Sequence, residues 1–200
     1  MQHIMPALWK PGRGVFMKEL DMNLYLFQFY HEVDVKRVME GCPWSFNRRA
    51  LVMARLKERE NPRCVDLNFL ELWVQVHDLR IGFISEKILT GIGNYIGKFV
   101  KSCPSNFTGA WRDYMRIRVS IDLCMPLKRR MKIKMTGDDW YWVNLKYENV
   151  PTFCFICGII GHSDRFCSKL FEVAGDDIAK PYGSWMRAPF RNQVKPIGAR

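Results

Sequence analysis

Apolar and polar residues alternate with a period of two in 115–123 and again in 128–135, which is typical of half-buried β-strands. The clearest stretch is 115–123, in which Ile117, Val119 and Ile121 alternate with polar residues. Two other segments, 33–41 and 84–92, have helical spacing and end near glycine. The pattern predicts these two helices and strands at 15–20, 24–30, 50–56, 72–77, 97–102, 115–123, 129–135 and 140–147.

The order of these elements predicts an α+β domain over residues 1–150. The polar segment 57–66 holds Pro62 and mixed charges, which makes it a candidate linker between sub-units 1–56 and 68–150. A small cysteine-rich segment follows at 151–170. Proline and glycine recur in residues 171–200, and that segment is therefore interpreted as a basic, loop-like tail.

Charge narrows the range of partners. The 200 residues contain 31 Lys and Arg against 20 Asp and Glu, a formal net charge of +11. Such an excess favours a polyanion, either nucleic acid or an anionic membrane surface. No apolar stretch is long enough to span a bilayer, and the N-terminus has no pattern of a secretory signal. We therefore expect an intracellular protein, nuclear or cytoplasmic with nuclear favoured, and no membrane partner.

One motif carries specific chemistry. Cys154, Cys157, His162 and Cys167 have the spacing C-x2-C-x4-H-x4-C, which supplies three thiolates and one imidazole for a tetrahedral Zn²⁺. Gly158 and the glycine before His162 stand where a chain folding around a metal needs left-handed backbone. Because all four ligands come from the protein, the pattern predicts one structural zinc ion without an open catalytic position.

The densest basic stretch runs from 112 to 134 and holds eight Lys and Arg. If residues 124–127 close a hairpin, Arg118 and Lys134 come near each other across the strands, and like charges so placed need an anion between them. Two interpretations stay open, a solvated outer face and a phosphate-binding surface. The candidate phosphate contacts are Arg116, Arg118, Arg130, Lys132 and Lys134.

Aromatic residues near the cysteines are candidates for base stacking. Phe155 follows the first cysteine, where a short zinc knuckle can expose a ring to a nucleotide base. Phe166 precedes the last cysteine as a second stacking candidate or a packing residue, and Arg165 is the only cation inside the motif. The consecutive aromatics at 140–142 cannot all face a core, but aromatic strand residues are more often packing residues.

Catalytic motifs are missing from the sequence. The glycines at 91, 93 and 97 do not have dinucleotide-loop spacing, and His77-Asp78 has no nucleophile motif beside it. We therefore expect a protein that is not an enzyme and that has no small-molecule substrate.

Several motifs together carry a family resemblance. Leu8-Trp-Lys-Pro-Gly, Pro43-Trp-Ser-Phe, Leu72-Trp-Val-Gln-Val-His-Asp-Leu and Tyr147-Glu-Asn-Val-Pro-Thr-Phe-Cys-Phe-Ile-Cys-Gly are similar to a plant family associated with LINE-type retrotransposons, in which a domain of unknown function precedes one zinc knuckle. The resemblance implies an RRM-like, ferredoxin-like or related sheet with short helices, followed by a CCHC-type nucleic-acid-binding module. In that family the domain begins further upstream, so the resemblance implies an N-terminally truncated domain.

Two functions remain in competition. The first is a non-enzymatic, zinc-dependent protein that binds single-stranded RNA or DNA and derives from a gag-like or ORF1-like retroelement product. The second is an assembly module that self-associates or binds host proteins, with the zinc knuckle as a structural staple.

Overall fold

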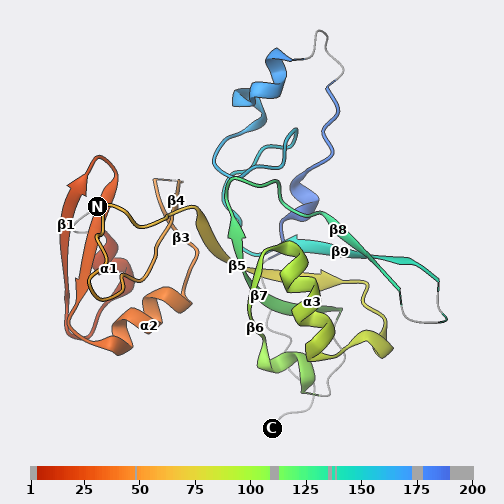
Figure 1. The fold of residues 1–200 in the computed structure, drawn as a ribbon, viewed down its shortest axis with the longest axis horizontal. Helices are drawn as coiled ribbons and strands as arrows, with labels where there is room; N and C mark the ends of the chain where they lie inside the picture. Colours follow the sequence, from red (N-terminus) through yellow and green to blue (C-terminus); the bar gives the residue numbers. More distant parts are fainter. Residues whose placement is uncertain are drawn as a thin grey trace.

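The centre of the molecule is a five-stranded antiparallel sheet with the strand order β6-β7-β5-β9-β8 (Figure 1). The computed structural model describes residues 4–47, 49–108, 113–134, 137, 139–172 and 178–189. The mixed α+β class predicted from the sequence is confirmed. The strands of this sheet are β5 (Phe69–His77), β6 (Lys98–Ser102), β7 (Tyr114–Asp122), β8 (Arg130–Ile133) and β9 (Tyr141–Tyr147).

Helix α3 (Glu86–Ile96) packs its apolar stripe against one face of this sheet. Ser85 caps its N-terminus by accepting a hydrogen bond from the Ile88 amide, which satisfies one orphan donor of the first turn. The predicted end at 92 is wrong, because α3 continues through two glycines to Ile96. Gly93 lies against Phe99, and a Cβ there would come within 2.6 Å of the Phe99 ring, so glycine permits the close approach of β6.

The connectivity explains why one predicted strand pair is wrong. The units β5, α3, β6 and β7 follow a β-α-β-β path, the first half of a ferredoxin-like arrangement. Strand β7 therefore inserts between β5 and β6, and β8 pairs with β9 at the opposite edge. As a result Arg118 lies opposite Trp73 and Lys101, and the predicted hairpin that would bring it near Lys134 does not form.

The N-terminal unit has its own small core around Met5, Trp9 and Val38. An apolar cavity of about 470 Å³ lies between β2 and the segment that follows β4. The predicted strand at 50–56 is shorter than expected, since β4 ends at Leu51. The elements are α1 (Ile4–Trp9), β1 (Val15–Asp21), β2 (Leu24–Phe29), α2 (Glu32–Glu40), β3 (Trp44–Phe46) and β4 (Arg49–Leu51), with β1 paired to β2 and β3 paired to β4.

Residues 178–189, here called the strap, lie against the end of β9. The side chain of Met186 is fully buried in the main core, and the Ala188 amide donates to the Tyr147 carbonyl at 2.9 Å. Arg187 Nη1 donates to the Val150 carbonyl at 2.7 Å. This part of the predicted loop-like tail is therefore packed into the fold. The sequence predicts four tail cations as phosphate contacts, of which Arg187 instead holds backbone carbonyls. The other three, Arg191, Lys195 and Arg200, lie outside the described residues.

Short 3₁₀ helices complete the described chain at Ile81–Phe83, Pro104–Phe107, Asp164–Phe166, Ser168–Phe171 and Ser184–Met186. Within the described ranges, no helix is both long and apolar enough to cross a bilayer.

Candidate metal centre and nucleic-acid interface

The four predicted zinc ligands converge in the structure. The ligand atoms of Cys154, Cys157, His162 and Cys167 all lie within 4.8 Å of one another, and Cys157 Sγ is 3.4 Å from His162 Nε2. A tetrahedral zinc with Zn–S of about 2.3 Å and Zn–N of about 2.0–2.1 Å needs ligand separations of about 3.5–3.8 Å. The donor set and its geometry therefore fit one structural zinc ion.

The backbone around this site folds as the glycine positions predict. Gly158 has φ +79° and Gly161 has φ +114°, both in the region that favours glycine. Between them the chain turns back, and the Cys154 amide donates to the Ile159 carbonyl at 2.9 Å while the Gly161 amide donates to the Thr152 carbonyl at 2.8 Å. The tight turn places the first two cysteines on the same side as His162.

Amide groups already point at the sulfur of Cys154. The amides of Ile156 and Cys157 lie 3.3 and 3.4 Å from Cys154 Sγ. Burial raises the pKa of the Cys154 thiol, but these N–H donors together with hydrogen bonds from the Cys157 and Cys167 side chains leave the pKa lowered. Burial raises the pKa of Cys157 to about 11. A bound zinc ion deprotonates a coordinating thiol, so Cys157 becomes a thiolate with the metal in place.

The knuckle is fixed to the sheet instead of being carried on a free linker. The Leu127 amide donates to the Gly158 carbonyl at 3.0 Å, and Phe153 and Ile160 are part of the main core. From the strap, Tyr182 lies against Gly158, and Lys180 pairs with Asp164 at 2.8 Å. The metal site and the β8–β9 end of the sheet therefore form one packed unit.

The two aromatic residues of the knuckle differ in exposure. Phe155 is half-buried against the main core and contacts Phe153 edge to face at 5.4 Å, so the expectation of an open ring is not met. Phe166 is 80% exposed at the end of its 3₁₀ turn, and Arg165 beside it is also exposed. The turn that carries Arg165 and Phe166 is thus one part of the knuckle surface that is open to a ligand.

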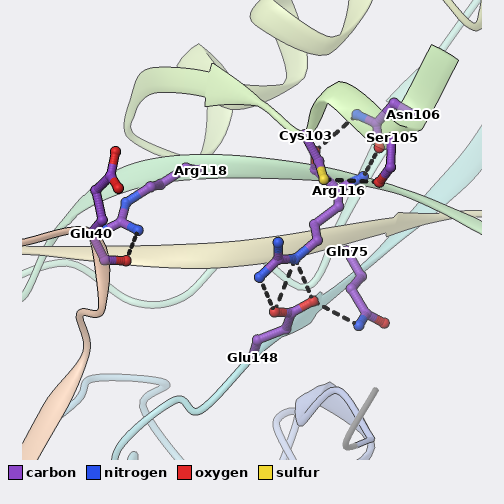
Figure 2. Close-up of polar contacts among 8 residues, drawn as sticks. All are labelled: Glu40, Gln75, Cys103, Ser105, Asn106, Arg116, Arg118 and Glu148. Carbon is purple, nitrogen blue, oxygen red and sulfur yellow. Dashed lines mark hydrogen bonds and ion pairs between the residues drawn. The ribbon is translucent and has the colours of Figure 1, made fainter. Parts of the chain in front are cut away.

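The expectation that Arg116 lies on an open face is wrong. Its guanidinium makes a two-pronged ion pair with Glu148, with Nε at 2.9 Å from Oε1 and Nη2 at 2.8 Å from Oε2 (Figure 2). Its Cζ also stands 3.7 Å from the centroid of the Trp73 ring. Burial disfavours the charge on Arg116, yet the hydrogen bonds to Glu148 leave its pKa raised. Gln75 donates to the same carboxylate at 3.0 Å and completes the network.

Arg118 is likewise not available to phosphate, because its side chain is 2% exposed. Its Nε donates to Glu71 at 2.6 Å, while Nη1 and Nη2 donate to the carbonyls of Glu40 and Met39 at 2.7 and 2.8 Å. Figure 2 shows Arg118 pointing at the Glu40 backbone. These carbonyls end α2, so the side chain caps that helix and joins the N-terminal unit to the sheet. Sequence alternation cannot detect that the C-terminal end of α2 lies against the Arg118 side chain.

The other three candidate cations stay on the surface. Arg130 and Lys132 are exposed on the edge strand β8, and Lys134 is exposed directly after it. Beside them Trp140 and Trp142 are 57% and 45% exposed. The sequence predicts these two rings as packing residues, and this prediction is wrong. Val143, Leu145 and Tyr147 are buried at alternate positions of β9, so Trp142 and Trp140 lie on the opposite, exposed face.

Comparison with known protein families finds a match for the N-terminal residues and another for the zinc knuckle. Residues 1–63 match the profile of a domain of unknown function (DUF4283), and residues 121–169 match that of a zinc knuckle, a match that includes β8 and β9 as well as the metal ligands. The Uncharacterized protein At4g02000 of Arabidopsis thaliana is 21% identical over 140 residues, which cover 68% of this chain and 42% of that protein. The chain thus spans less than half the length of this curated relative. No solved structure matches. The chain carries DUF4283 followed by a CCHC-type zinc knuckle, in the order that the resemblance implied.

Proposed function

We propose that this protein binds single-stranded RNA or DNA in a zinc-dependent manner and has no catalytic activity. The convergence of three thiols and one imidazole in a zinc knuckle is the observation that carries the proposal. The net charge of +11 supplies the attraction for a polyanion, since phosphate neutralisation dominates the affinity for nucleic acid.

Within this proposal the metal holds the knuckle in shape, and the side chains of the protein make the contacts. Zinc supplies structural cross-linking of the loop when bound. Phe166 offers an exposed ring for stacking, and Arg165 lies next to it for a phosphate. The half-buried Phe155 stays a candidate contact.

We further propose an origin in a retroelement, as a gag-like or ORF1-like product, and an intracellular location with the nucleus favoured. The order of DUF4283 and zinc knuckle supports this origin, since the family that the motifs resemble has the same order. The similarity to an Arabidopsis protein is consistent with a plant source.

Titration of labelled single-stranded RNA and DNA tests the proposal. With about four phosphate contacts on a single strand, raising the salt from about 50 to about 200 mM should weaken binding about 50-fold. Removal of zinc by a chelator, or Cys157→Ser, should abolish the tight binding together with the metal content. Cys64→Ser is the matched control, because Cys64 is an exposed free cysteine outside the metal group. Tight binding that survives without zinc, or no binding at all, contradicts the proposal.

A second function is favoured by one observation. The knuckle and the 3₁₀ helix that follows its last cysteine carry two strongly exposed aromatic side chains, Phe166 and Phe171, which are 80% and 93% exposed. Exposed rings of this kind also occur in protein interfaces, so an assembly module with zinc as a staple is the competing proposal. Sedimentation of the zinc-loaded protein separates the two, because only the assembly module predicts a concentration-dependent oligomer that Phe171→Ser dissociates.

A further inference from the structure

The outer face of the β8–β9 ribbon alternates cations with tryptophans. In the pairing of the two strands, Lys132 lies opposite Trp142 and Arg130 lies opposite Asn144. Directly opposite residues share one face of a sheet, and the intervening positions Ile133 and Val143 are buried on the other. We call Arg130, Lys132, Lys134, Trp140 and Trp142 the outer ladder.

Four members of the outer ladder contact one another. Arg130 Cζ stands 4.1 Å from the centroid of the Trp142 ring, and Lys132 Nζ stands 5.8 Å from the centroids of both Trp140 and Trp142. These are cation–π distances. Trp142 keeps 45% exposure and Trp140 keeps 57% exposure in spite of these neighbours, so each ring still presents area to a ligand.

The cations of the outer ladder have no carboxylate partner among the residues that the structure describes. Among the ion pairs between described residues, none involves Arg130, Lys132 or Lys134. Arg116 and Arg118 on the same sheet are by contrast committed to Glu148 and Glu71. The outer ladder therefore brings together three cations that have no ion pair among the described residues, next to two exposed tryptophans.

We propose that the outer ladder is a binding surface for single-stranded nucleic acid, with bases stacked on Trp142 and Trp140 and phosphates held by Arg130, Lys132 and Lys134. This proposal rests on the proposed function and assigns it a second site outside the knuckle. Aromatic rings interleaved with cations are the chemistry that recognises unpaired bases on a charged backbone.

The spacing of the rings selects single strands. Positions two apart on a strand are separated by about 6.7 Å, which is twice the 3.4 Å rise per nucleotide of a duplex strand. Neighbouring bases can therefore reach both rings only when they are unstacked from each other. A duplex would offer this surface its phosphates alone.

The outer ladder is continuous with the zinc knuckle. Leu127 is hydrogen-bonded to Gly158 of the knuckle, and the side chain of Arg129 donates to the Pro181 carbonyl of the strap at 2.9 Å. Strand β8 begins at the next residue and runs away from the knuckle along the ribbon (Figure 1). One strand of nucleic acid can thus contact the knuckle and the outer ladder together.

The test compares Trp142→Leu and Trp140→Leu with the unchanged protein on labelled single strands of about 12 nucleotides, a length within the usual site sizes. Each substitution should weaken binding about 5- to 150-fold, the loss of one stacked base. The same changes should leave binding to an abasic strand of equal length and to a duplex unaltered. Parallel RNA and DNA strands show which of the two the surface prefers.

Matched controls come from strand β1, where Phe16 and Lys18 are exposed in the same alternation. Phe16→Leu should leave the affinity unchanged. Lys132→Gln should flatten the salt dependence by about 0.7 for one lost phosphate contact, and Lys18→Gln should not. Zinc content and thermal unfolding of each variant verify that the fold is intact, and Trp142→Phe should restore part of the affinity because a ring is retained.

The outcomes separate this inference from the proposed function. If the unchanged protein binds single strands in a zinc-dependent manner and both tryptophan variants bind equally well, the outer ladder is not a stacking surface while the proposed function stands. If the unchanged protein binds no strand, both fail. If Trp142→Leu instead dissociates an oligomer without changing strand affinity, the face is a protein interface and the inference is overturned.

Discussion

Replacing Arg118 by Met distinguishes a structural arginine from a phosphate ligand. The guanidinium is 2% exposed and donates to Glu71 and to the carbonyls of Met39 and Glu40 at the end of α2. Met has a similar length but no donors, so Arg118→Met removes the hydrogen bonds that tie the N-terminal unit to β7. We expect the free energy of unfolding to fall.

The size of the loss follows from the three contacts. Two charged hydrogen bonds to carbonyls contribute about 1.5–3 kcal/mol each. The ion pair with Glu71 contributes about 0–1 kcal/mol, because that carboxylate is 38% exposed and screened by water. Removing the buried charge returns part of its desolvation energy. The net destabilisation is therefore about 2–4 kcal/mol, which lowers the melting temperature by roughly 4–16 °C in a chain of this size.

The assay is thermal unfolding followed by circular dichroism, together with the salt dependence of single-strand binding. Arg130→Met is the matched control, since Arg130 is exposed on β8 and should leave the melting temperature within about 1–2 °C. Arg118→Met should leave the salt slope unchanged under conditions where the variant is folded. A melting temperature close to that of the parent, combined with a slope flattened by about 0.7, would refute this reasoning and restore Arg118 as a phosphate contact.

Three further predictions concern the knuckle and the strap. Gly158→Ala should destabilise the protein by at least about 1–2 kcal/mol in denaturant titration, because its φ is left-handed and the new Cβ would overlap the Tyr182 ring. Adding Tyr182→Ala should relieve the overlap but not the backbone strain. Full recovery of stability in the double variant would contradict the backbone argument. Met186→Ala should cost about 2–5 kcal/mol as a fully buried side chain, whereas an unchanged melting curve would show that the strap does not pack. Phe166→Ala should weaken single-strand binding about 5- to 150-fold without altering stability. Phe155→Ala should lower stability with zinc stoichiometry intact. If Phe155→Ala weakens binding and Phe166→Ala does not, Phe155 carries the stacking.

Local sequence patterns predicted the features that depend only on residues close together in the chain. The zinc ligands of the knuckle are separated by at most a few residues each, so their spacing alone determined which side chains meet. The helix at Glu32–Glu40 and the strands Val15–Asp21 and Lys98–Ser102 lie within one or two residues of their predicted bounds. In each case the periodicity and the flanking turn residues belong to the element itself.

Contacts between residues far apart in the chain could not be predicted from such local patterns. Whether Arg118 faces water depends on α2, whose contacting carbonyls are 78 and 79 positions away. The placement of β7 beside β5, and not beside β8, depends on a helical crossover rather than on the short loop at Cys124–Leu127. Met186 is buried because the strap returns to β9, which the surrounding prolines and glycines do not indicate. Alternation identifies two faces of a strand but not what covers each.

The strap also changes the thermodynamics of metal binding. Because Arg187 holds Val150, 37 positions apart along the chain, the knuckle is a loop whose two ends are already joined. Closing a free loop of this length opposes folding by about 3 kcal/mol of chain entropy. In an excised peptide, part of the free energy of metal binding would have to offset this entropy loss. In the whole protein, packing of the core around Met186 and Tyr147 offsets it instead. The four ligands are therefore kept at a high effective concentration, and the intact protein should hold zinc more tightly than the knuckle peptide alone.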